Sequence, residues 1–224
     1  MFVDNLIVSV GLSIYQDCQS VRRLIPSIHK QVDYIIVVDG RYPGFGYEGS
    51  SGLSTDGTRE YLLQFPRIRL IDMPNSGQVA KRTRYLTEAG KYKTDVLIVL
   101  DADEWIEERN KGGWSEFRRD VAEILDEENQ GLGPVHNVFG IWERYGDPDQ
   151  FQHNPRVILK PGQCEYYHHH NFIRNRSKRY REWMEPPISQ GLVLRGNNDL
   201  RSKKREQRMT EYEYLQSECD EKFT

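Results

Sequence analysis

The sequence is short of cysteine, and the few cysteines it has are not arranged for a structural role. Its 224 residues include three cysteines, an odd number, and no two of them have CxxC spacing. This pattern predicts neither a disulfide framework nor a zinc knuckle, and it favours a reducing compartment. We therefore expect a cytoplasmic protein.

Long apolar runs are also missing. The longest, such as Val96 to Leu100, are far shorter than the ~20 residues of a membrane-spanning helix. Residues 1–4 do not place a basic region before an apolar one, as a secretory signal does. The sequence therefore predicts a soluble chain.

Neither sign of charge is in large excess. Acids number 34 and bases 31, so the formal net charge is −3, which gives no support to nucleic-acid binding driven by bulk charge. The hydrophobic fraction is 37%, and counting the 18 glycines raises it to about 45%, the ordinary value for a globular chain. Any polyanionic ligand must therefore be held by local groups.

Strands and helices alternate through the first hundred residues. Residues 34–38 and 96–100 are apolar at every position, which is typical of strands buried on both faces of a parallel sheet. Residues 6–10 and 68–71 add two more strands, and helical spacing separates the four runs. The pattern predicts an α/β fold with a doubly wound, Rossmann-like parallel sheet, whose ligand lies beyond the carboxyl ends of the strands.

The pattern changes after Trp114. One helix is followed by strand candidates with no long helix between them, at residues 135–142, 156–159 and 166–173. Consecutive strands without crossover helices predict a mixed or antiparallel extension of the sheet in the second half.

The strongest chemical signal is a pair of carboxylates, Asp101 and Asp103, directly after the buried run 96–100. Two carboxylates this close repel one another, and a site that keeps both ionised usually contains a cation. Mg²⁺ or Mn²⁺ bridging to phosphate oxygens is the simplest choice. The alternative is an acidic turn after a strand.

Further motifs accompany this pair in a fixed order. They are Val37-Val38-Asp39, Thr55-Asp56-Gly57-Thr58, Asn75-Ser76-Gly77, Ala80 and Val99 to Glu104. In order and approximate spacing, residues 5–110 resemble the family 2 glycosyltransferases. In that family the fold is called GT-A, a nucleotide-sugar donor sits across the carboxyl edge of the sheet, and a divalent metal holds its diphosphate against the DxD motif.

The resemblance implies roles for individual residues. Asp39 would accept from the base, and Ser13 and Tyr15 would line the nucleotide pocket. Asp101 and Asp103, with Ala102 between them, would serve the ribose and the metal, Mn²⁺ or Mg²⁺.

The resemblance also implies one GT-A domain over residues 1–224, with a nucleotide-sugar-binding half at 1–110 and an acceptor- and metal-completing half at 111–224. The tetrapeptide 101–104 looks like that of a subgroup acting on lipopolysaccharide or similar glycans. The expected partners are a nucleotide-sugar donor, with UDP favoured, and a glycan, glycoprotein or lipid-linked acceptor. No nucleic-acid partner is expected.

Bases gather at the start of the helix after Gly77. Lys81 and Arg84 share a face at i, i+3, and a helix N-terminus favours anions, so we expect these two to reach the donor diphosphate. Arg82 lies between them in the sequence. The alternative is a solvated basic face.

Residues 168–170 are three consecutive histidines. On a strand His168 and His170 would project from the same face. Imidazole ligates Mn²⁺-like metals, so we predict that His170 completes the metal shell or touches the diphosphate. Hydrogen-bonded strand histidines are the alternative.

Inverting transfer, which the resemblance favours, needs a carboxylate that takes the proton of the acceptor hydroxyl. The candidates are Glu104, Glu143, Asp147 and Glu165. Glu104 lies beside the metal motif, a position that also suits a structural or an acceptor-orienting group. Sequence alone does not choose between them.

Residues 41–54 depart from the family pattern, in which the second strand runs directly into the Asp-Gly-Thr motif. The glycines and aromatic residues of this insertion predict a mobile flap over donor or acceptor, or else a tolerated surface loop. The basic stretch 195–208 could steer the donor or contact the inner membrane surface, and a solvated helix is its alternative. The modest length leaves room for a further domain to complete the site.

Two rival functions stay open. A nucleotidyltransferase also sets acidic groups and metal at a doubly wound sheet, but residues 11–15 are a poor version of its Gly-rich basic loop. A binding module that lost turnover is the non-enzymatic rival, and the intact Asp39, Asp101 and Asp103 argue against it.

Overall fold

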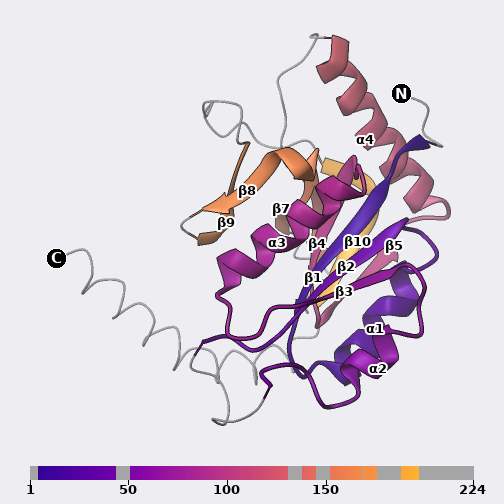
Figure 1. Cartoon of the computed structure of the whole chain (residues 1–224). Coiled ribbons are helices and arrows are strands. Elements are labelled where there is room, and N and C mark those ends of the chain that lie inside the picture. Colours follow the sequence, from indigo (N-terminus) through magenta and orange to yellow (C-terminus); the bar gives the residue numbers. More distant parts are fainter. Residues whose placement is uncertain are drawn as a thin grey trace.

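A computed structural model describes residues 5–43, 51–130, 138–144, 152–167, 169–175 and 188–196. Eight strands of these residues form one sheet in the order β3-β2-β1-β4-β7-β6-β10-β5 (Figure 1). The strands are β1 (Val8–Ile14), β2 (Tyr34–Asp39), β3 (Ile68–Asp72), β4 (Val96–Asp101), β5 (Glu104–Glu108), β6 (Val138–Arg144), β7 (Gln152–Leu159) and β10 (Ile188–Gly196). The helices are α1 (Cys18–Ile28), α2 (Thr58–Leu62), α3 (Gln78–Lys91), α4 (Gly113–Gln130) and the short η2 (Pro161–Gln163).

The first half of the sheet is parallel. Strands β3, β2, β1 and β4 pair in parallel, with α1, α2 and α3 in their connections. All four strands therefore end at one edge of the sheet. The predicted α/β fold with a Rossmann-like sheet is confirmed.

The second half is mixed, as predicted. Strand β7 runs antiparallel to both β4 and β6, β10 runs parallel to β6, and β5 closes the sheet antiparallel to β10. Strand β5 was not predicted, because three of its five residues are glutamates. An edge strand needs to bury only part of its side chains, and here Glu104 and Ile106 are the buried ones.

A predicted single strand at 166–173 is wrong. The structure places β8 (Cys164–Tyr167) and β9 (His169–Asn175) there, paired antiparallel in a separate two-stranded sheet. This stretch lacks the Asn-Gly or Asp-Gly dipeptide that marks a tight hairpin, so its pattern resembled one continuous strand.

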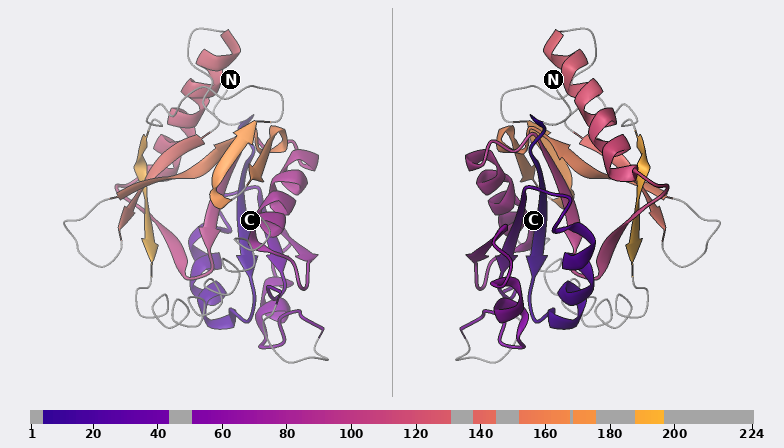
Figure 2. Two further views of the ribbon diagram at one scale, coloured as in Figure 1. Left: turned by 90° about the vertical axis from the view of Figure 1, so that its left-hand side faces the viewer. Right: turned by 90° about the vertical axis from the view of Figure 1, so that its right-hand side faces the viewer.

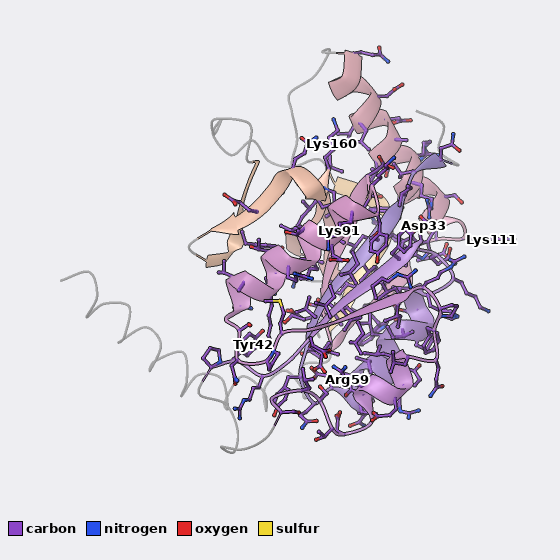
Figure 3. All side chains as sticks on the ribbon, in the orientation of Figure 1. Asp33, Tyr42, Arg59, Lys91, Lys111 and Lys160 are labelled. Carbon is purple, nitrogen blue, oxygen red and sulfur yellow. The ribbon has the colours of Figure 1, made fainter. Side chains whose placement is uncertain are left out.

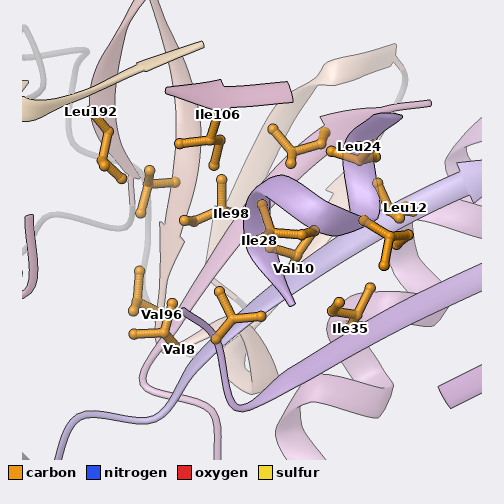
Figure 4. Packing of buried hydrophobic residues seen from close by; sticks show 14 of the residues in the cluster. Val8, Val10, Leu12, Leu24, Ile28, Ile35, Val96, Ile98, Ile106 and Leu192 are labelled. Atoms are coloured by element: carbon orange, nitrogen blue, oxygen red, sulfur yellow. The ribbon is translucent and has the colours of Figure 1, made fainter. Parts of the chain in front are cut away.

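Alternate residues of the parallel strands face two cores. One face packs against α1, α2 and α4, and Figure 4 shows Val10, Leu12 and Ile35 in this cluster. The other face packs against α3 and β8 through residues such as Ile36 and Leu97. Each fully buried aliphatic side chain contributes roughly 1.5–3 kcal/mol. The result is three layers, with α3 on one side of the sheet and α1 and α4 on the other (Figure 2).

Close packing fixes the position of α3. A Cβ atom added at Gly11 of β1 would lie 2.9 Å from Cδ2 of Tyr85, so only glycine lets the helix approach this closely. None of the helices in the described ranges is long and apolar enough to cross a membrane.

Candidate functional site

The residues predicted to bind the nucleotide-sugar donor lie along the carboxyl edge of the parallel strands. Asp39 ends β2 and Asp101 ends β4, with β1 between them. In register, Ile14 pairs with Asp39 and Ser13 pairs with Asp101. Neighbouring strands lie ~4.8 Å apart, so the two acidic positions are about 10 Å apart across β1. A nucleoside with its phosphates could extend along such an edge.

Asp39 is fully buried and accepts from three donors. Its oxygens accept from the N–H of Ser54 at 3.1 Å, from Oγ of Ser54 at 2.6 Å and from Nη1 of Arg59 at 2.7 Å. Such partners are what allows a carboxylate to be buried. The predicted contact of Asp39 with a base stays a prediction. In this structure the carboxylate joins α2 and residue 54 to the end of β2.

Arg59 links the ends of β2 and β3. The same Nη1 atom lies 2.8 Å from Oδ1 of Asp72, and Figure 3 shows Arg59 near the end of the sheet where these strands finish. Partial burial alone would lower the pKa of Arg59, but its hydrogen bonds with Asp39 and Asp72 raise it. The guanidinium is therefore a fixed positive charge at this edge.

Lys81 is buried and reaches the strand edge from the first turn of α3. Its Nζ donates to the carbonyl of Gly40 and lies 4.2 Å from the centroid of the Tyr42 ring. The Tyr42 hydroxyl is 3.5 Å from Oγ of Ser13 (Figure 3 labels Tyr42). Tyr42 belongs to the predicted flap at 41–54, of which residues 44–50 lie outside the described residues.

Arg84 does not share this position. Its side chain is 44% exposed, 3.8 Å from the carboxylate of Glu88. The buried side chains of α3 are Lys81, Arg82, Tyr85, Leu86 and Ala89, and Arg84 lies about 130° from the middle of that face at 3.6 residues per turn. The expectation that Lys81 and Arg84 act from one face is therefore not met.

Asp101 instead has two arginine neighbours. Oδ1 accepts from Nη2 of Arg82 at 3.1 Å, and Oδ2 lies 3.9 Å from Nη1 of Arg156 on β7. The Asp101 side chain is 32% exposed, so this cluster reaches the surface. Sequence reasoning missed Arg156, although a single arginine beside the apolar residues Val157, Ile158 and Leu159 was a signal.

Glu104 holds both Asp101 and Arg156 through hydrogen bonds. Its side chain is 2% exposed, Oε2 accepts from the N–H of Asp101 at 2.7 Å, and Oε1 accepts from Nη2 of Arg156 at 2.8 Å. Both oxygens are therefore engaged in holding neighbours. This arrangement favours the structural role over that of a catalytic base.

Tyrosines surround the other side of Arg82. Its Cζ lies 5.9 Å from the ring centroid of Tyr166, whose hydroxyl accepts from that of Tyr85 at 3.3 Å. Burial raises the pKa of both tyrosines, so their hydroxyls stay neutral. Burial alone would lower the pKa of Arg82, but the nearby Tyr85, Asp101 and Tyr166 raise it.

The fit of a metal depends on Asp101 and Asp103. In the ranges that the structure describes, no three or more His, Cys, Asp and Glu side chains gather in a group that could hold a metal ion. Mg²⁺ typically uses one or two carboxylates and takes its other ligands from water and substrate phosphates. The two carboxylates fit that kind of site. Both oxygens of Asp101 face arginines, so a metal held there would share Asp101 with Arg82 and Arg156.

The remaining predicted residues are placed only in part. His170 belongs to β9, which lies beside α3, but its side chain is outside the described part of the chain, as is residue 168. Glu143 belongs to β6, with its Cα opposite Gln152, and its side chain is likewise outside the description. Asp147 lies wholly outside it.

Two further predicted residues flank the site. Tyr15 follows β1, and its N–H donates to Oδ2 of Asp17 at 2.9 Å. Ala102 is buried between Asp101 and Asp103. Both therefore lie at the carboxyl edge, where the sequence predicted them.

No protein-family model matches this sequence, and no curated protein matches it. Among solved structures, glucosyl-3-phosphoglycerate synthase from Mycobacterium tuberculosis, in complex with Mn²⁺, UDP and glucosyl-3-phosphoglycerate, overlaps with a TM-score of 0.37 and 17% identity. The overlap covers 64% of this chain and 45% of that one, so this chain spans less than half of its length. The same enzyme with UDP-glucose and phosphoglyceric acid gives 0.38 and 16%, over 65% and 46%.

A cytidylyltransferase from Leptospira borgpetersenii overlaps with a TM-score of 0.31 and 11% identity, over 69% of this chain and 60% of that one. Likenesses of this size decide neither the family nor the chemistry.

Proposed function

We propose that this chain is a metal-dependent glycosyltransferase of the GT-A type. It would transfer a sugar from a nucleoside diphosphate donor, with UDP as the nucleotide, to a glycan, glycoprotein or lipid-linked acceptor, with inversion. The observation that carries the proposal is the position of Asp101 and Asp103 at the end of β4, on the same sheet edge as Asp39 and Ser13. The resemblance of residues 5–110 to family 2 supports it.

In this proposal, different residues of the sheet edge bind different parts of the nucleotide-sugar donor. The nucleoside lies over the ends of β1 and β2, near Ser13 and Tyr15, and the diphosphate lies toward the end of β4. Asp103, assisted by Asp101 and His170, holds Mn²⁺ or Mg²⁺. When bound, the metal offsets the charge that develops on the leaving nucleoside diphosphate.

The acceptor side belongs to the second half of the chain. Glu104 is engaged by Asp101 and Arg156, so we place the base at Glu143 or Asp147. Either carboxylate would take the proton from the acceptor hydroxyl as its oxygen attacks the anomeric carbon. Lys81, whose Nζ contacts the ring of Tyr42, lies at the edge of the proposed nucleotide site.

A panel of radiolabelled nucleotide sugars tests this function. We expect slow, Mn²⁺-dependent hydrolysis of one donor, with release of its nucleoside diphosphate. Glu143→Gln or Asp147→Asn should abolish acceptor-dependent transfer while donor binding persists. Release of pyrophosphate from a nucleoside triphosphate and a sugar phosphate, without hydrolysis of any nucleotide sugar, would contradict the proposal and identify a nucleotidyltransferase.

A further inference from the structure

We infer that Arg82 and Arg156 form a two-arginine site for the donor diphosphate, and that Asp101 holds the two guanidiniums in place. The inference rests on the proposed function, because it assumes a nucleoside diphosphate donor. Arg82 and Arg156 would then both bind phosphate, and the main task of Asp101 would be to orient them.

The side chains of Arg82 and Arg156 converge on Asp101. Arg82 comes from α3 on one face of the sheet, and Arg156 comes from β7 within it, yet both guanidiniums reach the carboxylate of Asp101. Arg156 is held from a second side by Glu104. Two guanidiniums oriented by carboxylates form a rigid set of N–H donors, which suits the oxygens of a phosphate group.

Arg82 has an unused hydrogen-bond donor. Its side chain is 7% exposed, and its buried Nε has no hydrogen-bond partner within the part of the chain that the structure describes. Leaving a buried donor unsatisfied costs about 1–3 kcal/mol. Since Nη2 of the same guanidinium already contacts the partly exposed Asp101, a phosphate oxygen at this cluster would find an unused donor beside it.

The charges near the two arginines are mostly negative. Arg82 and Arg156 contact two carboxylates, Asp101 and Glu104, and Asp103 follows Asp101 by two residues in the sequence. These five side chains are net negative, which suits a cation and opposes a diphosphate. A divalent cation at Asp103 would make the set net positive. Diphosphate binding at the arginines should therefore depend on the metal.

A purely structural role, in which the arginines only neutralise Asp101 and Glu104, is the competing explanation. The two roles differ in what they predict for phosphate-free ligands. A phosphate site changes the affinity for a nucleoside diphosphate and spares that for the nucleoside. A structural role changes both together, through the shape of the sheet edge.

Calorimetric titrations with Mn²⁺ separate these outcomes. UDP and GDP identify the nucleotide that the wild type binds, and the matched nucleoside is titrated beside it. Arg82→Lys and Arg156→Lys should each weaken nucleoside diphosphate binding at least tenfold and change nucleoside binding less than twofold. Arg84→Lys, an exposed arginine on the same helix, is the matched control and should change neither.

Arginine Nε–H signals in NMR spectra of the wild type provide a second readout that needs no folded variant. Two of them should shift when the nucleoside diphosphate is added with Mn²⁺, and neither should shift with the nucleoside. Lysine variants that bind like the wild type, or that lose affinity for nucleoside and nucleotide equally, would overturn this inference and leave the proposed function standing. A wild type that binds neither UDP nor GDP would overturn the proposed function with it.

Discussion

Oε2 of Glu104 accepts a hydrogen bond from the backbone N–H of Asp101 at 2.7 Å, so the acid that follows Asp101-Ala102-Asp103 fixes the backbone at the start of that segment. Its second oxygen holds Arg156 at 2.8 Å. One buried carboxylate thus connects the end of β4, the start of β5 and the middle of β7. The sheet therefore fixes the position of Asp101, as a free loop would not.

Glu104→Gln should therefore destabilise the protein. The amide keeps an acceptor for one contact but removes the charge opposite a mostly buried arginine, and breaking such a pair costs about 3 kcal/mol. Urea unfolding measures the change. Glu107→Gln is the matched control on the same strand, because Glu107 pairs with Arg195 at the surface and should cost less than about 1 kcal/mol. An unaltered stability with complete loss of transfer would instead make Glu104 the catalytic base.

Asp39→Asn tests the second anchor of the site. The substitution removes the charge that Arg59 faces inside the protein, and we expect a loss of about 3 kcal/mol on unfolding. Asp72→Asn removes the other partner of Arg59, which is 52% exposed, and should cost less than about 1 kcal/mol. Equal losses in the two variants would show that burial of Asp39 does not matter.

Gly11→Ala tests the approach of α3 to β1. The new methyl group would lie 2.9 Å from Cδ2 of Tyr85, and overpacking of this kind costs about 1–3 kcal/mol. Gly77→Ala is the control, since nothing lies within 4 Å of its Cβ position. Thermal unfolding should show a lower Tm for the first variant only. Recovery in Gly11→Ala/Tyr85→Leu would identify the clash as the cause.

Asp56 should make stability depend on acid pH. Partial burial alone would raise the pKa of Asp56, but hydrogen bonds from Thr58 and from the N–H of Cys18 lower it below its ordinary value of 3.8. A carboxyl with a depressed folded-state pKa stabilises the protein above its unfolded value. That contribution should be complete above about pH 4 and lost as pH falls through the lower, folded pKa.

Urea unfolding at a series of pH values measures this effect. The wild type should lose its advantage over Asp56→Ala below pH 3.8. A difference between the two proteins that is constant from pH 6 to pH 2 would contradict the assignment.

The parallel half of the fold follows from local patterns. Runs such as 34–38 and 96–100 are apolar at every position, and parallel strands place Asp39 and Asp101 on one edge without further information. The contact of Arg156 with Asp101 could not be predicted, because it depends on non-local strand pairing. Arg156 meets Asp101 only because β7 inserts antiparallel beside β4, and no local pattern sets that pairing.

Side-chain direction on α3 was the other limit. The i, i+3 spacing with Lys81 favoured Arg84, whereas the structure buries Arg82, because the buried face of the helix depends on where Gly11 lets it approach β1. The hairpin of β8 and β9 was missed because it lacks the usual turn residues.

The most direct test of the proposed function is calorimetric titration of UDP and GDP with and without Mn²⁺, on the wild type, Asp103→Ala and the exposed control Glu123→Gln of α4. The wild type and Glu123→Gln should both bind one of the two nucleotides, and only in the presence of Mn²⁺. Asp103→Ala should bind that nucleotide at least tenfold more weakly. Binding that is absent, or independent of Mn²⁺ and unchanged in Asp103→Ala, would contradict the proposed function.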